Sequence, residues 1–279
     1  MSTSSQPIAV ITGGARGIGR QLATDLLARG YRVVIGDLDQ AATDATAAEL
    51  GAGASAVRLD VTDRTNLAAV VAHVEATVGP IALWINNAGI MPTGPFRDQK
   101  MDVARAIIDI NYAGVVEGTA AVLPGMLERH AGTVVNLASA TGIKPLAGVA
   151  VYSGTKAAVI AFTQSLRREL RGTGVRLIVV SPNLVRTALG AGITPPRLTG
   201  VITAPMVSAA IMAALDRPRR FSIVVPRRLA PVLRLSNSLP IRLRDWVDDH
   251  AGSDEVGLGG DPAVREQYLS GVLGKGTKG

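Results

Sequence analysis

The 279-residue sequence contains no cysteine and no long apolar run. Without cysteine, neither disulfide bonds nor thiolate metal sites can form, and nothing in the composition argues for export. The longest unbroken apolar stretches are a few residues long, as in IAVI at 8–11 and LIVV at 177–180, whereas a membrane-spanning helix needs about 20. The N-terminal MSTSSQPIAVI lacks the basic and long apolar parts of a secretory signal. We therefore expect a cytoplasmic protein with no membrane-spanning segment.

Aromatic residues are also scarce, and acidic residues are absent from one C-terminal stretch. Three Phe, four Tyr and two Trp leave few side chains for stacking on bases. The net charge of +7 comes from Arg217–Arg244, which holds eight arginines and no acidic residue, because the remainder carries 21 basic against 22 acidic residues. Among these arginines Phe221 is the one aromatic residue, so we expect no nucleic-acid partner.

The sequence does contain a regular alternation of short β-branched runs and longer amphipathic stretches, which is typical of βαβ units. Runs such as YRVVIG and VRLIVV are apolar throughout, which indicates strands buried on both faces. The predicted fold class is α/β, a Rossmann-like doubly wound sheet of seven mostly parallel strands with helices on both faces. Strands are expected at 7–12, 32–37, 55–60, 81–86, 132–138, 175–181 and 222–225, and helices at about 18–30, 39–50, 64–78, 101–130, 152–171 and 203–215.

A glycine-rich segment, ITGGARGIGRQLA, follows the first strand. Gly13, Gly17 and Gly19 would let the backbone turn tightly and approach a pyrophosphate at a helix N-terminus. Such a segment can also be only a turn, and its spacing differs from G-x-G-x-x-G. Asp37, however, ends the second strand 18 residues after Gly19, near where a carboxylate binds an adenosine ribose. Together these features favour a dinucleotide site.

Polar residues follow the third and fourth strands as well. Asp60 stands in RLDVT, and NNAG occupies 86–89. Strand ends are often polar for no functional reason. The carboxyl ends of parallel strands nevertheless meet at one edge, where such sheets bind ligands. We expect these residues to lie together there.

A tyrosine and a lysine are spaced four residues apart in YSGTK, at Tyr152 and Lys156. On a helix, residues i and i+4 share a face. A nearby ammonium would favour the phenolate and lower the pKa of the tyrosine toward working pH, as a general acid or base requires. An isolated pair of this kind is more often a surface contact. Ser139 favours the catalytic interpretation, because it follows the buried strand TVVNLA and falls at the same sheet edge.

Asn111 lies in DINYAG, inside a long apolar segment that is predicted to be helical. A buried amide is costly unless it is hydrogen-bonded. Asn111 can therefore be a satisfied core amide or part of the same site, and its sequence position alone leaves both alternatives open.

These motifs together resemble the short-chain dehydrogenase/reductase family. TGGARGIG, LDVT, NNAG, the Asn of DINYAG, the Ser of NLASATG, YSGTK and SPNLVRT follow the family's order and spacing over roughly residues 6–226. The resemblance implies one Rossmann-fold domain over 1–226 and an NAD(P)-dependent alcohol dehydrogenase or carbonyl reductase. It also implies a catalytic tetrad with Asn111 fixing a water, Ser139 orienting the substrate oxygen, Tyr152 moving the proton, and Lys156 holding the nicotinamide ribose and lowering the pKa of Tyr152.

The resemblance also implies the cofactor contacts. NAD is the expected cofactor and NADP the less favoured one, because Asp37 would repel a 2′-phosphate, although Arg16 could assist NADP. Apart from Tyr152 and Lys156, the residues implied to bind the cofactor are Gly13, Arg16, Gly17, Ile18, Gly19, Asp37, Asp60, Val61, Asn87, Ala88, Gly89, Pro182, Val185 and Thr187.

One motif departs from the family, which has Pro-Gly where this chain has Pro182-Asn183. Asn tolerates a positive φ better than most residues, so we expect the turn to survive and the amide to enter the pocket. No metal site is expected, because the three histidines have no partner at ligand spacing. A hydrophobic alcohol or ketone is the expected substrate, since apolar residues follow several strand ends, namely Met91, Pro92, Phe96, Ile143, Leu146, Val149 and Leu189.

The tail, 227–279, is expected to be a helical extension packed on the domain, with GKGTKG at its end frayed. Leu229, Val232 and Leu233 form one apolar stripe, and Leu243, Trp246 and Val247 form another. Asn237 or Ser238 could cap the second of two short helices, with Pro240 in its first turn. The two apolar faces could cover the substrate pocket as a lid, contact another subunit, or lie weakly on a membrane surface.

Two alternatives to an enzyme remain at this stage, a nucleotide-binding sensor without turnover and a protein associated with a membrane surface. The family resemblance also implies that the helices at 101–130 and 152–171 pair with copies of themselves. A homodimer or homotetramer is therefore expected.

Overall fold

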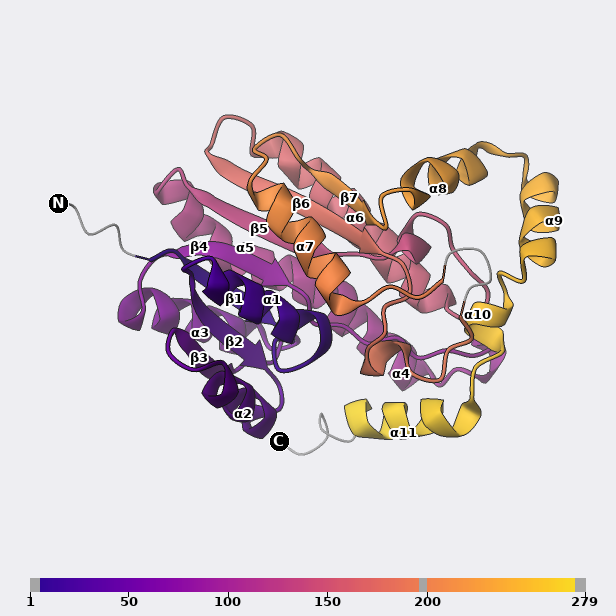
Figure 1. The fold of residues 1–279 in the computed structure, drawn as a ribbon, viewed down its shortest axis with the longest axis horizontal. Coiled ribbons are helices and arrows are strands. Elements are labelled where there is room, and N and C mark those ends of the chain that lie inside the picture. The colour runs from indigo at the N-terminus through magenta and orange to yellow at the C-terminus, as the bar shows by residue number, and fades with distance from the viewer. Residues whose placement is uncertain (1–5, 196–199, 274–279) are drawn as a thin grey trace.

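The computed structural model describes residues 6–195 and 200–273, and its centre is one seven-stranded sheet (Figure 1). Every neighbouring pair of strands is parallel, in the order β3-β2-β1-β4-β5-β6-β7. The predicted α/β class is confirmed. The strands are β1 (Ile8–Thr12), β2 (Arg32–Asp37), β3 (Ala54–Arg58), β4 (Ile81–Asn86), β5 (Gly132–Leu137), β6 (Val175–Pro182) and β7 (Ser222–Val225).

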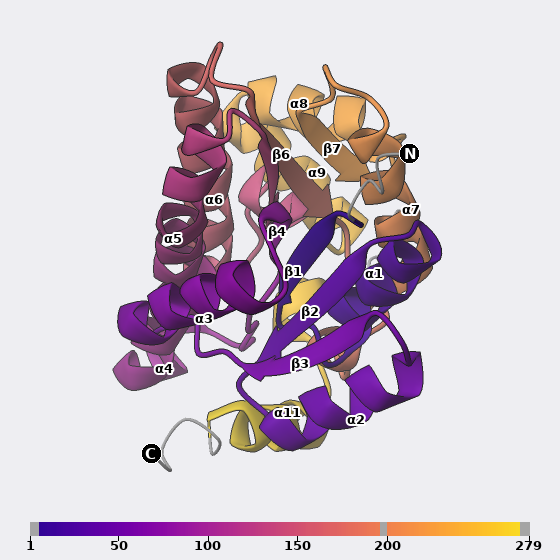
Figure 2. The same cartoon turned by 90° about the vertical axis from the view of Figure 1, so that its left-hand side faces the viewer.

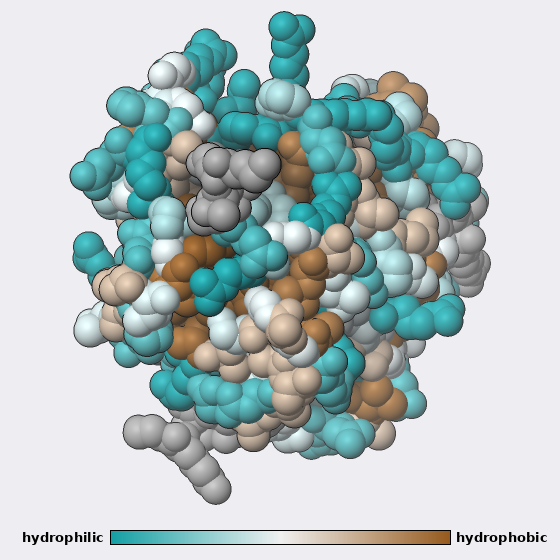
Figure 3. All heavy atoms as spheres, turned by 60° about the vertical axis from the view of Figure 1, so that its left-hand side comes forward, coloured by the Kyte–Doolittle hydropathy of each residue, from teal (hydrophilic) through white to brown (hydrophobic). Residues whose placement is uncertain are grey.

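Helices cover both faces of the sheet because alternate strand residues point to opposite sides. Ile11 and Ile35 belong to the core on one face, whereas Val10 and Val34 belong to the core on the other. One layer holds α1 (Gly17–Ala28), α2 (Gln40–Leu50) and α7 (Ala204–Leu215), and the other holds α3 (Arg64–Thr77), α5 (Gly114–Glu128) and α6 (Ala150–Glu169) (Figure 2). Hydrophilic residues dominate the face seen in Figure 3, where apolar residues show in patches.

The long helix predicted at 101–130 is interrupted. It consists of α4 (Met101–Ile108), one π-helical turn, η2 (Asp109–Ala113), and α5. Met101–Glu128 as a whole is long and apolar enough to cross a membrane, with mean hydropathy 1.3 over its most apolar window, but 39% of that window is buried. The segment contributes Val115, Val122 and Met126 to the core. Its length and hydropathy are therefore also those of a core helix in a globular domain.

The chain reverses its direction of winding between β1 and β4. From β1 the sheet grows through β2 to β3, and from β4 it grows the other way to β7. A parallel sheet opens a crevice at such a switch point, beyond the carboxyl ends of its strands. The loops at that edge contain three short 3-10 turns, η1 (Phe96–Asp98), η3 (Ala140–Gly142) and η4 (Ala188–Gly190).

A buried polar network ties the middle of the sheet to the helices beside it. The Asn86 amide nitrogen donates to Asn136 Oδ1 at 2.8 Å and to Thr119 Oγ1 at 3.1 Å, and its oxygen accepts from the Trp84 indole at 2.7 Å. Asn136 in turn donates to Thr163 Oγ1 at 3.0 Å. Four elements, β4, β5, α5 and α6, are thereby locked together next to the crevice.

Within the described residues up to 273, four helices follow the sheet, whereas the sequence predicted two. They are α8 (Leu229–Ser238), α9 (Ile241–Ala251), α10 (Glu255–Leu258) and α11 (Pro262–Leu273). The predicted cap was wrong, because α8 continues through Ser238 and Pro240 itself is the N-cap of α9. Proline fits there because its missing N–H is not needed. The fraying expected at GKGTKG lies outside the described residues.

Candidate active site

The glycine-rich loop adopts the backbone that its glycines were expected to permit. Gly13 and Gly17 have φ of +63° and +56°, a region that side chains with a Cβ rarely adopt. A Cβ at Gly13 would lie 2.8 Å from Ala88 Cα, and one at Gly17 would lie 3.3 Å from Thr187 Cγ2. The N-cap residue of α1, Arg16, makes no side-chain capping bond. The first turn of α1 therefore faces the cavity with donors suited to a pyrophosphate.

Asn87 joins this loop to the end of β4. Its side chain donates to the carbonyl oxygens of Thr12 and Gly13 at 3.0 and 2.9 Å, and the Thr12 hydroxyl accepts from the backbone N–H groups of Asn87 and Ala88. Gly19 lies beneath the loop, where a Cβ would be 2.3 Å from the Gly13 oxygen. Its role in this structure is therefore to permit close packing, and it does not line the cavity.

Two carboxylates, Asp37 and Asp39, stand beside the adenosine end of the cavity. Asp37 accepts from the backbone N–H of Ala15 at 3.2 Å and from that of Asp39 at 3.4 Å. The Arg16 guanidinium lies 3.5 Å from the Asp39 carboxylate. The positive charge that could have favoured a phosphate is thus paired with an acidic side chain. Asp60 accepts from the backbone N–H and the hydroxyl of Thr62, which orders the next wall of the cavity.

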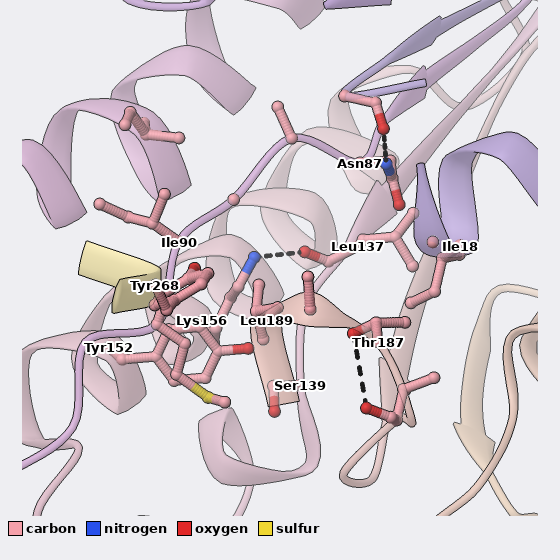
Figure 4. A pocket seen from close by; sticks show the side chains of 18 of the residues that line it. Ile18, Asn87, Ile90, Leu137, Ser139, Tyr152, Lys156, Thr187, Leu189 and Tyr268 are labelled. Atoms are coloured by element: carbon pink, nitrogen blue, oxygen red, sulfur yellow. Dashed lines mark hydrogen bonds between the residues drawn. The ribbon is translucent and has the colours of Figure 1, made fainter. Parts of the chain in front are cut away.

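Tyr152, Ser139 and Lys156 converge at the other end of the cavity (Figure 4). Tyr152 and Lys156 lie one turn apart on α6, both almost fully buried, and the lysine nitrogen is 5.7 Å from the tyrosine ring centroid. Ser139 follows β5 and stands beside Tyr152 (Figure 4), and its hydroxyl oxygen accepts from the backbone N–H and the hydroxyl of Thr141 at 3.2 and 3.0 Å. The Lys156 ammonium donates to the Leu137 carbonyl at 2.9 Å. Strand β5 therefore aligns both partners of the tyrosine.

The expected lowering of the tyrosine pKa was wrong for this structure. Burial raises the pKa of Tyr152 to about 12, which outweighs the opposing effect of the nearby Ser139 hydroxyl. Burial likewise lowers the pKa of Lys156 to about 8. The common cause is the loss of water around both groups, which disfavours each charged form. The position of the Lys156 ammonium is fixed by two contacts, one with the Tyr152 ring and one hydrogen bond to the Leu137 carbonyl.

Asn111 is fully buried in the π-helical turn, and both ends of its side chain are paired. Its amide nitrogen donates to the Ile90 carbonyl at 2.8 Å, and its oxygen accepts from the Ile90 N–H at the same distance. The side chain therefore clamps the loop after β4. It does not line the cavity.

The turn after β6 tolerates asparagine without a positive φ. Asn183 is not among the residues with positive φ, and its backbone N–H donates to the Val225 carbonyl at 2.8 Å. Asn183 does line the cavity, as expected, while its amide nitrogen donates to the Gly200 carbonyl. Val185 is held by a bridge to Ile202, and Thr187 packs close to Gly17 in the cavity wall.

One cavity of about 1020 Å³ contains all the predicted site residues except Gly19 and Asn111. A side chain at Gly13, Gly17 or Gly89 would meet neighbouring protein atoms, so only glycine lets these backbone segments pack this closely in the cavity wall. Of the apolar residues expected around the substrate, Met91, Leu146, Val149 and Leu189 line the cavity. Phe96 is instead 57% exposed, and Ile143 packs under α8; Pro92 is not part of the lining. The cavity lining also includes residues that no sequence motif indicated, among them Val103, Ala106, Ile110, Leu184, Ile193, Val256, Gln267, Tyr268 and Gly271.

The most informative of the missed residues belong to α11, which lies across the substrate end. Arg265 is only 5% exposed. It donates to Thr93 Oγ1 at 3.1 Å, to the carbonyl oxygens of Leu189 and Ala191 at 3.0 Å each, and to the Met91 carbonyl. The loops after β4 and β6 are thereby tied together.

Tyr268 stands beside Arg265 and enters the cavity next to Tyr152 (Figure 4). Its hydroxyl accepts from the Met91 N–H at 3.2 Å, and the Arg265 guanidinium lies 4.6 Å from its ring centroid. A sequence signal for α11 existed in Asp261-Pro262. Asp261 accepts from the N–H groups of Ala263 and Val264, as an N-cap does, and proline suits the first helical position.

Comparisons with known proteins agree with this geometry. A family model described as short chain dehydrogenase matches residues 7–197. Ketoacyl reductase HetN of Nostoc sp. is 34% identical over 221 residues, which are 77% of this chain and 77% of that protein. A short-chain dehydrogenase/reductase from Burkholderia phymatum in complex with NAD has a TM-score of 0.77 at 25% identity, and the match covers 85% of this chain and 95% of that one.

A short-chain dehydrogenase from Sphingobium yanoikuyae in complex with NADPH has a TM-score of 0.74 at 30% identity, with 83% of this chain and 92% of that chain covered. The two structures show that similar proteins bind NAD in one case and NADPH in the other. From its fold, its Ser-Tyr-Lys geometry and these similarities, the chain belongs to the short-chain dehydrogenase/reductase family of oxidoreductases.

Proposed function

We propose that the protein transfers a hydride between NAD and a hydrophobic alcohol or ketone, with Tyr152 as the general acid or base. The observation that carries this proposal is the buried Tyr152, beside Ser139 and Lys156, in the same cavity as the glycine loop. The bound nicotinamide would supply or accept the hydride. Ser139 would hold the substrate oxygen, and Tyr152 would give its proton to that oxygen in reduction or take it in oxidation. The Lys156 charge would stabilise the phenolate as it forms.

The substrate class follows from the lining of the cavity and from one relative. Apolar side chains from the loops after β4, β5 and β6 surround Tyr152, and the similar HetN protein is described as a ketoacyl reductase. Closure by α11 would exclude water from the reacting groups. The apolar lining and the similarity to a ketoacyl reductase both favour an extended apolar alcohol or ketone over a small polar one.

Two further expectations stay proposals. We propose that copies associate into a dimer or tetramer through the α5–α6 face, and a cytoplasmic location remains the prediction of the cysteine-free composition. Of the apolar residues that suggested this contact, Val115, Val122 and Val159 are buried within one chain. The others are only half-buried and can meet a partner, namely Val116, Leu123, Ile160, Phe162 and Leu166.

Tyr152→Phe should abolish turnover while leaving NAD binding nearly unchanged, because only the proton-carrying oxygen is removed. Steady-state absorbance of NADH and calorimetric titration of NAD would measure the two effects. Tyr31→Phe, at a turn far from the cavity, is the matched control and should keep full activity. Retention of more than a few per cent of activity in Tyr152→Phe would contradict the mechanism.

Ketone reduction should decline above about pH 8, as Lys156 loses its proton, because its lowered pKa leaves it uncharged at higher pH. Tyr152, with its pKa raised to about 12, keeps the proton it must donate. Alcohol oxidation should instead increase with pH, since there Tyr152 must accept a proton. Profiles of kcat/KM in both directions would show this opposition. Reduction that stays constant well above pH 8 would exclude Lys156 as the titrating group.

NAD should be used with a higher kcat/KM than NADP. Two negative charges ~4 Å apart repel by about 4 kcal/mol at an effective dielectric constant near 20, and Asp37 would face the 2′-phosphate while Asp39 occupies Arg16. Asp37→Ala should raise kcat/KM with NADP and so reduce the ratio of kcat/KM between NAD and NADP. Asp44→Ala, on the exposed side of α2, is the control. A wild-type preference for NADP would refute the assignment.

Arg265→Met should raise KM and lower kcat/KM for hydrophobic substrates by about a hundredfold, which is the size expected when substrate loops shift by about 1 Å. NAD affinity should stay within a factor of a few, because Arg265 contacts only the substrate loops. Tyr268→Phe keeps the apolar wall and should have a smaller effect, and the exposed Glu266→Gln is the control. If Arg265→Met weakened NAD binding and substrate use equally, α11 would have no specific role at the substrate end.

A further inference from the structure

The helices α8 and α9 carry a concentration of exposed apolar side chains, which we call the α8–α9 surface. Leu235 is 67% exposed and Trp246 is 56% exposed, values that are unusual for such large apolar groups. Figure 1 shows both helices at the upper right margin, beyond the layers of the sheet and its helices. The apolar members of the surface are Val232, Leu235, Ile241, Leu243, Trp246 and Val247.

Helix α9 turns Asp248 toward the protein and its large apolar residues toward solvent. Asp248 is mostly buried where it pairs with Lys144 and accepts a hydrogen bond from Ser253. At about 100° per residue, Leu243, Trp246 and Val247 lie roughly 100–160° around the helix from Asp248. This is the reverse of the usual arrangement for a helix on a globular domain.

Helix α8 divides its apolar residues between two sides. Leu229 and Leu233 are buried against Val224 and Ala140, so packing within the chain explains that half of the predicted stripe. Leu235 lies about 120–160° around the helix from these two residues, Val232 lies about 60–100° from them, and both are exposed. Since no described segment covers them, intramolecular packing does not explain why these positions are apolar.

The charge around the α8–α9 surface identifies what it can contact. Arg227, Arg228, Arg234 and Arg242 are exposed on or beside the two helices, within the arginine-rich segment that has no acidic residue. Of the exposed acidic residues of α9, Asp245 lies about 160° around the helix from Leu243 and Val247, whereas Asp249 lies about 60° from Trp246, so the exposed charge is positive in sum and not throughout.

A symmetric contact through this surface would bring the arginines of both copies into one interface, where their like charges repel. An anionic lipid surface has the complementary charge, and apolar side chains with a tryptophan suit its interfacial region. We propose that the α8–α9 surface docks the protein reversibly on membranes that contain anionic phospholipid.

This docking would place the substrate end of the cavity near the lipid. Ala140 lines the cavity and also packs under Leu229 and Leu233, and the loop that contains it continues to Lys144, the anchor of α9. The segment from Ala140 to Lys144 therefore both lines the cavity and supports helices α8 and α9. An apolar substrate dissolved in lipid would be close to its site. The docking itself does not depend on the proposed oxidoreductase activity.

The test is co-sedimentation of the full chain with phosphatidylcholine vesicles, with and without phosphatidylglycerol. The protein should pellet with the anionic vesicles and be released by salt, because arginine–headgroup attraction is screened. Replacing two arginines, in Arg234→Gln/Arg242→Gln, should weaken partitioning by about thirtyfold, at roughly one factor of five per charge. Leu235→Ser/Trp246→Ser should also abolish pelleting.

Matched controls separate docking from misfolding. Phe96→Ser removes an aromatic side chain as exposed as Trp246, at 57%, and Arg64→Gln removes an exposed charge on α3; both should pellet like the wild type. Thermal melting should be unchanged in every variant, since all the substituted side chains are exposed. Absence of pelleting, or equal pelleting with uncharged vesicles, would overturn the proposal. A lower molecular mass for Leu235→Ser/Trp246→Ser than for the wild type by light scattering would also overturn the proposal, because the surface would then be a contact between copies.

Discussion

The hydrogen bond between the buried amides of Asn86 and Asn136 is the interaction on which the site most depends. It joins β4 to β5, and the adjoining bonds to Thr119 and Thr163 extend the connection to α5 and α6. These four elements carry or precede Asn87, Ser139, Tyr152 and Lys156. Buried amides without partners are strongly unfavourable, so the network permits one relative position of the strands and helices.

Burial then decides the chemical state of the catalytic groups. The same desolvation raises the pKa of Tyr152 and lowers that of Lys156, so at neutral pH the tyrosine holds its proton and the lysine is close to losing its own. A hydroxyl in this state suits proton donation to a carbonyl oxygen. Leu137, whose carbonyl accepts from Lys156, and Ser139, which stands beside Tyr152 (Figure 4), are two residues apart in the chain, so the end of β5 aligns both groups.

The C-terminal extension has two parts that face different surroundings. Helix α11 turns inward, where the buried guanidinium of Arg265 satisfies carbonyl oxygens of two separate loops and Tyr268 completes the cavity wall. Helices α8 and α9 turn an apolar and arginine-rich side outward. The lid that the sequence suggested for α8 and α9 is therefore formed by a helix further along the chain.

The local sequence pattern was sufficient to predict the sheet, the helices that cover it and the motif residues. Apolar periodicity and glycine spacing are features of a few neighbouring residues and can be read without the tertiary structure. The local pattern also placed Tyr152, Lys156 and Ser139 at one sheet edge, since parallel strands bring their carboxyl ends together. Only the tertiary structure decided that Asn111 clamps Ile90, that Gly19 lies beneath the loop, that Phe96 faces solvent, and that Arg265 reaches Met91 across more than 170 residues of chain. Those outcomes, like the raised pKa of Tyr152, depend on which distant segments exclude water from a side chain, and no local spacing encodes that.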